Sequence, residues 1–155
     1  MAVNLIIRLA EPQDLSILVK FNQALAQEAR GQSLNLQKLT KGIQAVLKDA
    51  NRGFYMLAEK DDKVIGSTFI NFEWSDWSNA WYWWLLDIYV EPNHRKKDVF
   101  RSLYAYLVTE AKAADVCGLR LYVYKGNTSA QKVFQKLGMV TSDSLIFEER
   151  LFPMP

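Results

Sequence analysis

The segment Leu86–Phe100, LDIYVEPNHRKKDVF, constrains most strongly what this chain can fold into. Its β-branched and aromatic residues indicate a strand that ends at Glu91-Pro92. Cations follow at residues 95–97, and an amphipathic helix is predicted to begin at about Asp98. The first N–H groups of a helix have no partner within the helix, and the helix dipole favours negative charge there. The pattern therefore predicts a site for an anion such as the pyrophosphate of a nucleotide-like cofactor.

Length and composition limit the class of protein. A chain of 155 residues, half of them apolar, suits one domain, and we expect a single domain over residues 1–155. A net charge of +2 is too small to argue for nucleic acid or membrane as a partner. No apolar run reaches the ~18 residues of a transmembrane helix, and the first residues lack a signal-peptide pattern, so we expect a cytoplasmic protein. With one cysteine and one histidine, no metal site is expected.

Hydrophobic periodicity predicts ten secondary-structure elements in the order β-α-α-β-β-β-α-β-α-β, which indicates a mixed α/β domain. Ligands in open α/β sheets bind outside the carboxyl ends of strands, which directs attention to Val90–Lys97 and Tyr124–Asn127. The predicted strands are Val3–Leu9, Phe54–Glu59, Val64–Trp74, Trp81–Val90, Leu119–Tyr124 and Ile146–Leu151. The predicted helices run from about Glu11 to Arg30, Asn35 to Asp49, Asp98 to Ala114, and Asn127 to Gly138.

Two segments in this order, LDIYVEP with the following HRKKDVFRSLYAYL, and YKGNTSAQKVFQKLGM, resemble the GNAT superfamily of N-acetyltransferases. The resemblance extends over nearly the whole chain. It implies an α/β fold with a mixed, mostly antiparallel sheet of six to seven strands, flanked by helices and splayed at the cofactor site. It also implies acetyl-CoA as the cofactor and an amine as the acceptor, and a homodimer is kept open as an assembly.

The resemblance also implies roles for particular residues. In that family, backbone amides of a loop with the pattern Arg/Gln-x-x-Gly-x-Gly/Ala bind the pyrophosphate of acetyl-CoA, and amides of the splayed strand polarise the thioester carbonyl. The matching loop residues here are Arg95, Lys96, Lys97, Asp98, Val99 and Phe100, and the matching strand residues are Ile88, Tyr89 and Val90. The family's later Asn-x-x-Ala pattern, with an aromatic residue four positions on, is matched by Asn127, Ala130 and Phe134. Asn127 is expected to hydrogen-bond the pantetheine arm.

The chain departs from the family pattern at three positions. Asp98 replaces a glycine, and a carboxylate near a pyrophosphate costs about 3 kcal/mol per charge pair at ~5 Å and an effective dielectric of ~20. Neighbouring cations could offset this repulsion, or Asp98 could instead cap the helix. Phe100 replaces a glycine or alanine. Phe134 replaces the tyrosine that protonates the leaving thiolate in many members, which phenylalanine cannot do.

Acetyl transfer to an amine requires a neutral amine, a polarised carbonyl and a proton for the sulfur. Asp87 is the first candidate base because an acid is costly within the apolar run Trp81–Val90, although a structural ion pair would also explain it. We expect its side chain to share a strand face with Trp81, Trp83 and Tyr89. Glu73 is the second candidate base. Tyr124 is the candidate acid, with ordinary packing as the alternative.

All five tryptophans lie between Trp74 and Trp84. Trp74, Trp81 and Trp83, with the nearby acids, fit an aromatic pocket that binds a cationic amine through cation–π contacts. Packing in the core or in a dimer interface explains the same residues without a substrate.

These observations predict an acetyl-CoA-dependent N-acetyltransferase acting on a primary amine. The acceptor could be a small molecule such as a polyamine or amino-acid derivative, or a peptide amine. The alternative is a non-catalytic acyl-CoA-binding module with a regulatory or interaction role, which the residues Asp98 and Phe134 favour.

Overall fold

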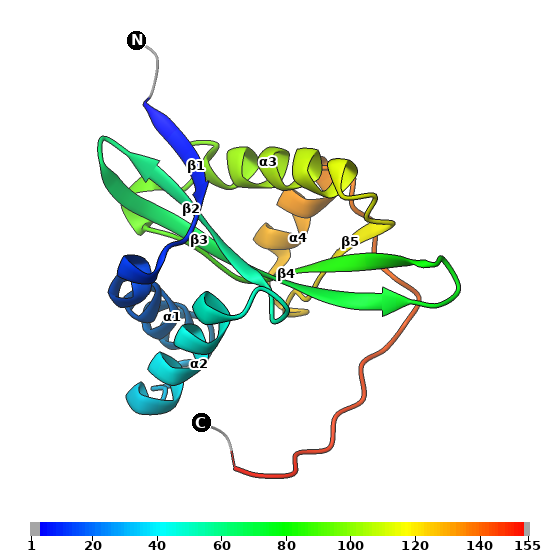
Figure 1. The fold of residues 1–155 in the computed structure, drawn as a ribbon, viewed down its shortest axis with the longest axis horizontal. Coiled ribbons are helices and arrows are strands. Elements are labelled where there is room, and N and C mark those ends of the chain that lie inside the picture. Colours follow the sequence, from blue (N-terminus) through cyan, green and yellow to red (C-terminus); the bar gives the residue numbers. More distant parts are fainter. Residues whose placement is uncertain (1–3, 154–155) are drawn as a thin grey trace. The chain divides into compact units, whose positions relative to one another are not determined.

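A five-stranded sheet organises the first part of the chain (Figure 1). The computed structural model describes residues 4–153, which form one unit up to Leu121 and a second from Tyr122 onward. Val3, at the start of the first predicted strand, lies outside the described residues. The strands of the first unit are β1 (Leu5–Leu9), β2 (Phe54–Lys60), β3 (Lys63–Ser75), β4 (Ala80–Val90) and β5 (Gly118–Leu121). Its helices are α1 (Leu15–Arg30), α2 (Leu36–Lys48) and α3 (Val99–Ala113), and the second unit contains α4 (Thr128–Lys136).

The strand order is β1-β2-β3-β4-β5, with antiparallel pairs except for the parallel pair β4–β5. This confirms the expected mixed, mostly antiparallel α/β sheet, although residues 4–153 contain five strands rather than six to seven. The predicted strand Leu119–Tyr124 is shorter, because its pairing with β4 ends at Leu121. The prediction of a strand over Ile146–Leu151 is wrong: these residues pair with no strand in the second unit, and an apolar segment without a partner edge does not form a strand.

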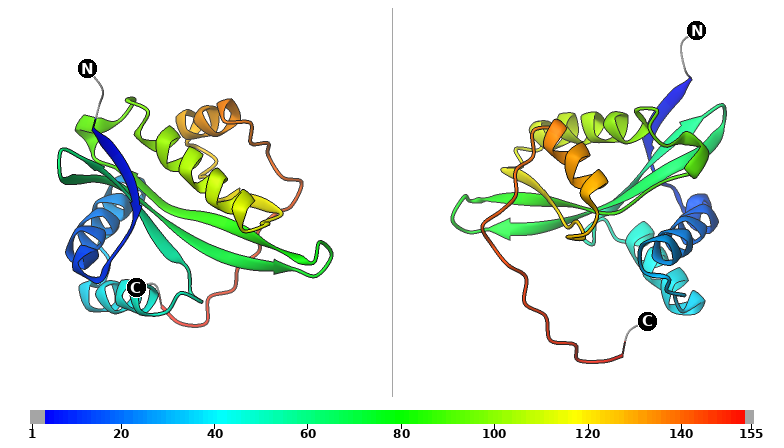
Figure 2. Two further views of the ribbon diagram at one scale, coloured as in Figure 1. Left: turned by 45° about the horizontal axis from the view of Figure 1, so that its top comes forward. Right: turned by 180° about the vertical axis from the view of Figure 1, so that it is seen from behind.

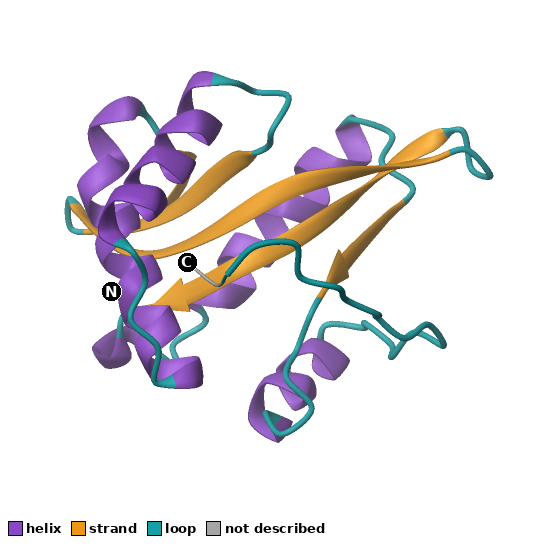
Figure 3. Ribbon diagram, turned by 90° about the horizontal axis from the view of Figure 1, so that it is seen from below, coloured by secondary structure: helices purple, strands orange, loops and turns teal. Residues whose placement is uncertain are grey.

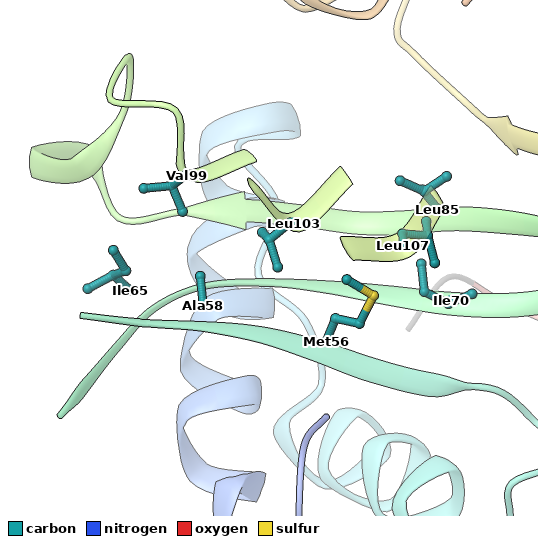
Figure 4. Close-up of a cluster of buried hydrophobic side chains, with 8 residues drawn as sticks. All are labelled: Met56, Ala58, Ile65, Ile70, Leu85, Val99, Leu103 and Leu107. Carbon is teal, nitrogen blue, oxygen red and sulfur yellow. The ribbon is translucent and has the colours of Figure 1, made fainter. Parts of the chain in front are cut away.

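The helices of the first unit cover opposite faces of its sheet (Figures 1 and 3). Successive residues of a strand point to opposite faces, so Leu57 packs against α1 and α2 while its neighbour Met56 packs under α3. The core on the α1–α2 face consists of Leu18, Ile43, Tyr55 and Leu57. The core on the α3 face consists of Met56, Ala58, Ile65, Ile70, Leu85, Val99, Leu103 and Leu107 (Figure 4).

Helix ends follow the signals in the sequence. Gly31 ends α1 in a left-handed conformation at φ 59°, which glycine adopts without steric cost. The Asn35 side chain accepts a hydrogen bond from the Lys38 amide at 3.0 Å at the start of α2. Among the described residues, no helix has the length and apolar content needed to cross a membrane.

An ion-pair network joins the N-terminal elements. The Arg8 guanidinium on β1 donates to both oxygens of Asp14, at 2.8 and 2.9 Å, and to Glu59 on β2 at 3.0 Å. Asp14 also accepts from the Glu11 amide at 2.7 Å, and its side chain is only 8% exposed. The hydrogen bond from Arg8, working against burial, lowers the pKa of Asp14 below its ordinary value. Two parallel charge-assisted bonds to a buried carboxylate are stronger than a surface pair.

We predict that Asp14→Asn destabilises the fold by about 2–3 kcal/mol at pH 7, because it leaves the Arg8 charge without its buried partner. A carboxyl whose pKa is lowered by folding stabilises the protein above its unfolded pKa of about 3.9, and this contribution is lost as the pH falls through the folded pKa. The difference between the variant and the wild type should therefore shrink in acid. Urea unfolding at pH 7 and pH 3 measures it.

Asp49→Asn is the matched control, because Asp49 pairs with Arg52 at 2.9 Å in an exposed ion pair. Exposed pairs contribute about 0–1 kcal/mol, so this variant should unfold close to the wild type. Equal losses in the two variants would contradict the special weight given to the buried pair.

Candidate functional site

Strand β4 extends beyond its partner β5. The parallel pairing covers only Tyr82–Leu85 of β4, whereas β4 continues to Val90 with β3 alone beside it (Figure 2). The expected splay of the sheet is therefore present in the first unit. Backbone N–H and C=O groups on the open side of Leu86–Val90 face no strand within that unit, and an unpaired strand edge is a template for an extended ligand.

A β-bulge marks the point where the edge opens. Ser67 pairs with Tyr89 and Phe69 with Leu86, so β4 holds one more residue than β3 in this stretch. Asp87 occupies the bulge with a left-handed backbone at φ 50°. The Thr68 hydroxyl donates to the Leu86 carbonyl at 2.9 Å and fastens the irregular pairing. A bulge shifts the alternation of the strand, so residues after it face differently from a continuous strand.

Hydrogen bonds on either side of the bulge identify which groups face the open edge. The Trp81 carbonyl accepts from the Cys117 amide at 2.9 Å, so odd-numbered residues before the bulge face the β5 side. The Glu91 amide donates to the Ile65 carbonyl at 2.8 Å, so odd-numbered residues after the bulge face β3. Alternation then directs the backbone groups of Ile88 and Val90 to the open edge, and those of Tyr89 to β3.

The backbone of the loop before α3 is irregular. Lys96 and Asp98 are both left-handed, at φ 61° and 64°. Glycine adopts this conformation freely, and aspartate tolerates it better than most other residues. The Asp98 side chain makes no capping hydrogen bond, so the alternative that it occupies the helix amides is wrong. Its carboxylate lies 3.8 Å from the Arg101 Nε in an exposed pair.

The loop cations divide into two kinds. Lys96 and Lys97 are exposed, and within residues 4–153 neither forms an ion pair. Arg95 instead pairs with Glu28 of α1 at 2.8 Å. Val99 is buried in the α3 core, so its side chain is held inside and only its backbone can meet a ligand. Phe100 packs beside Tyr104, with ring centroids 6.2 Å apart.

Tyr89 does not share a face with Trp83, contrary to the expectation from simple alternation. Tyr89 packs on Phe21 of α1 at 4.9 Å between ring centroids. Trp83 packs on Phe54 at 5.4 Å, within the cluster under α3. The bulge accounts for the difference, because the extra residue at Asp87 moves Tyr89 to the face covered by α1 and α2.

The Asp87 carboxyl group has an unusual environment. The residue is exposed by its accessible surface, and the protein atoms packed around the carboxyl raise its pKa above the ordinary value by desolvation. The phenol of Tyr55 on β2 is affected by the same charge: burial, and then the negative charge of Asp87, raise the pKa of Tyr55. A carboxylate with a raised pKa near an open strand edge has the property of a general base.

Glu73 has its carboxylate engaged. It accepts from the Trp84 indole at 2.8 Å and from the Arg120 Nη1 at 3.1 and 3.2 Å. The Arg120 guanidinium in turn stacks on the Tyr82 ring, with Cζ 3.6 Å from the ring centroid. Glu73, Trp84, Arg120 and Tyr82 thus form one network on β3, β4 and β5, and it makes Glu73 a weaker candidate base than Asp87.

The remaining tryptophans lie toward the tip of the β3–β4 hairpin. Trp74 and Trp81 meet edge to face at 5.0 Å between centroids, and each is nearly half exposed. Trp81 also contacts Phe72 at 6.2 Å, which places the pair on the α3 face of the sheet. Trp83 is partly buried and packs against the core on that same face.

The second unit carries Tyr124, Asn127 and Phe134. Tyr124 follows β5 rather than ending it, and its side chain is 78% exposed, while its carbonyl accepts from the Asn127 amide at 2.9 Å. The Asn127 side chain accepts from the Ala130 amide at 3.1 Å, which confirms Asn127 as the N-cap of α4. Phe134 lies half-buried on α4.

Two residues near the candidate site, Glu28 and Tyr55, could not be predicted from the sequence. Glu28 lies on the exposed side of α1, and no local pattern relates it to a loop that follows β4. Tyr55 is an ordinary inward-facing strand residue, and only the fold brings the charge of Asp87 close enough to raise its pKa. The alternation of β2 does predict that Tyr55 and Met56 face oppositely, but the bulge has no signature of its own in the sequence.

Comparison with known proteins agrees with this geometry. Residues 20–139 match the model of the acetyltransferase (GNAT) family. Among curated proteins, none matches the chain in sequence. A possible acetyltransferase from Clostridium difficile 630 shares 33% identity and a TM-score of 0.90, covering 98% of this chain and 100% of its own.

More distant solved structures share the fold. A predicted acetyltransferase with acetyl-CoA from Clostridium acetobutylicum has 22% identity and a TM-score of 0.77, covering 94% of this chain and 96% of its own. An aminoglycoside N-acetyltransferase in complex with CoA has 17% identity and a TM-score of 0.78, covering 98% of both chains. The family match spans well over half of the chain and includes the splayed strand and the cationic loop. The chain therefore belongs to the GNAT acetyltransferase family.

Proposed function

We propose that this protein transfers the acetyl group of acetyl-CoA to a primary amine. The observation that carries the proposal is the open edge of β4, which begins at a bulge and leads into the amides at the start of α3. An extended pantetheine arm matches an unpaired strand edge, and a pyrophosphate matches a helix N-terminus. The structural neighbour solved with acetyl-CoA supports the choice of cofactor.

On the cofactor side, amides of Ile88 and Val90 would bind the pantetheine arm and polarise the thioester carbonyl. Amides of the segment 96–100 would bind the pyrophosphate, and Lys96 and Lys97 would add positive charge. Asn127 uses its side-chain oxygen as a helix cap, which leaves its amide nitrogen as the donor for the pantetheine. Phe134 would contribute apolar contact only.

On the acceptor side, Asp87 would accept the proton of the amine. Its raised pKa increases its strength as a base. Tyr82 and Trp84 lie on that side of the sheet, but Arg120 stacks on Tyr82, so a carboxylate rather than an aromatic cage would recognise the cationic acceptor. This favours a small amine, with a polyamine, an amino-acid derivative or a peptide amine as candidate classes.

The leaving thiolate of CoA would take a proton from Tyr124 or from water. The exposed phenol of Tyr124 is accessible for such a role, and Phe134 has no hydroxyl to offer. A thiol with a pKa of about 8.5 is a tolerable leaving group, so the loss of a dedicated acid slows the reaction without stopping it. Tyr124→Phe should therefore cost at most about 10²-fold in rate.

A non-catalytic acyl-CoA-binding module is the second candidate, favoured by the carboxylate of Asp98 in the loop and by Phe134. Titration calorimetry with acetyl-CoA, followed by mass detection of acetylated products in a pool of amines, separates the two. Acetylated product with stoichiometric CoA release supports the enzyme. Tight binding without any product supports the module, and no binding overturns both.

We predict that Asp87→Asn lowers kcat by about 10²-fold or more while leaving the Kd for acetyl-CoA nearly unchanged, because only the proton transfer is lost. The wild-type rate should fall in acid as Asp87 becomes protonated, at a pH above the ordinary aspartate pKa. That acid limb should disappear in the variant. Rate profiles from pH 5 to 9 provide the measurement.

The melting temperature of the Asp87→Asn variant tests whether Asp87 has a structural role instead of a catalytic one. A carboxyl whose pKa is raised by folding contributes stability below its unfolded pKa, and this contribution is lost as the pH rises through its folded pKa, so the carboxylate form of Asp87 does not stabilise the fold. Asp87→Asn should therefore melt at the same temperature as the wild type or higher. A lower melting temperature with unchanged activity per folded molecule would identify Asp87 as structural.

We predict that Asp98→Gly tightens acetyl-CoA binding by about 3- to 10-fold, equivalent to about 0.7–1.4 kcal/mol. Glycine relieves the left-handed backbone at φ 64°, and the change removes a carboxylate beside the pyrophosphate site. Calorimetry at low and high salt measures the gain, which should shrink when salt screens the charge.

Asp98→Asn separates the two causes, because asparagine also tolerates the left-handed conformation but carries no charge. A gain in Asp98→Asn close to that of Asp98→Gly assigns the effect to charge, and a smaller gain assigns the remainder to the backbone. Weaker binding in both variants would contradict the placement of the pyrophosphate at this loop.

A further inference from the structure

The loop between β4 and α3 is held in a conformation that its residues do not favour. Lys96 and Asp98 are left-handed at φ 61° and 64°, and both carry a Cβ that disfavours this region. Such residues persist only where surrounding contacts over-determine the backbone. The Asp98 side chain supplies no cap, and its pairing with Arg101 at 3.8 Å is exposed. The restraint must come from elsewhere.

Arg95, which directly precedes Lys96 in the loop, contacts one residue of α1 and two residues of β4. Its Nη2 donates to both carboxylate oxygens of Glu28 on α1, at 2.8 and 3.1 Å. Its Nε donates to the Val90 carbonyl at the end of β4, at 2.8 Å. Its Cζ lies 5.4 Å from the centroid of the Tyr89 ring. The planar guanidinium of Arg95 thus contacts a carboxylate, a backbone carbonyl and an aromatic ring at once. The ammonium group of a lysine could not make the same set of contacts.

The surface that Arg95 binds is itself rigid. Tyr89 is buried and packs on Phe21 of α1, which is 2% exposed. Glu28 lies about two helical turns after Phe21, so Arg95 continues the α1–β4 contact beyond the core. Arg95 is therefore held by both α1 and β4, immediately before the left-handed residues Lys96 and Asp98.

We propose that Arg95 is a positioning residue, held by Glu28, that shapes the cationic loop for its anion and does not itself bind the phosphate. The inference rests on the proposed function only in naming that anion as the pyrophosphate of acetyl-CoA. Phosphate contact falls to the loop amides, Lys96 and Lys97. The Arg95–Glu28 pair, which we call the α1 latch, links α1 to the cofactor loop.

The two roles of Arg95 predict opposite signs for one substitution. If Arg95 were a phosphate ligand, Glu28 would compete with the pyrophosphate for it, and Glu28→Gln would release the guanidinium and tighten binding. If the latch shapes the loop, Glu28→Gln loosens the loop and weakens binding. Glutamine keeps the size and helical preference of glutamate, so the change is confined to charge and hydrogen bonding.

The experiment measures acetyl-CoA binding by calorimetry and the rate of tryptic cleavage after residues 95–97 without ligand. In Glu28→Gln we expect a Kd about 3- to 10-fold higher, and cleavage in the loop about fivefold faster, because proteolysis follows the population of the open loop. Arg95→Lys should behave alike, since lysine keeps the charge and the cleavage site but not the planar fork. Asp49→Asn, which removes another exposed ion pair distant in sequence from the loop, is the matched control and should match the wild type in both measurements.

Tighter or unchanged binding in Glu28→Gln overturns the proposal, as does loop cleavage at the wild-type rate. The cleavage measurement needs no cofactor. If the wild type fails to bind acetyl-CoA, the proposed function falls, while faster loop cleavage in Glu28→Gln still supports the latch and unchanged cleavage still overturns it.

Discussion

The early end of the β4–β5 pairing is the constraint on which the site depends. Parallel pairing stops at Leu85, one residue before the bulge begins, so β4 runs on to Val90 with one edge unpaired within the first unit. The bulge then turns the backbone of Ile88 and Val90 toward that edge and moves Tyr89 to the opposite face from Trp83. One irregularity therefore creates the strand edge on which the proposed cofactor site depends.

Unfavourable features concentrate around this edge. Asp87, Lys96 and Asp98 have left-handed backbones without being glycine, and Asp87 also has its pKa raised by burial. Of the other described non-glycine residues with positive φ, Asp61, Asp62 and Asn79 lie at strand turns, where this conformation is routine, and Asp115 follows the end of α3. Strain that is concentrated beside an unpaired strand edge is typical of a functional site, and the buried Arg8–Asp14 pair elsewhere in the unit supplies stability that can offset it.

The sequence predicts the regular elements well because each has a local cause. Periodicity predicts the helices, Gly31 and the asparagine caps predict their ends, and the cations before α3 predict an anion loop. The bulge has no local signature, so the expected grouping of Tyr89 with Trp81 and Trp83 on one face was wrong. The pairing of Arg95 with Glu28 depends on the packing of α1 against β4, and the strand expected over Ile146–Leu151 required a partner edge that apolar residues alone do not provide.

Residue-resolved amide exchange with and without acetyl-CoA tests the central claim most directly. The account predicts that the ligand slows exchange at Ile88 and Val90 and at the first amides of α3, Val99 to Arg101, while Tyr89, whose amide already faces β3, changes little. This alternation along β4 distinguishes a ligand paired with the strand edge from a general stabilisation of the fold. Uniform slowing along β4, or slowing only at residues outside β4 and the α3 N-terminus, would contradict the account.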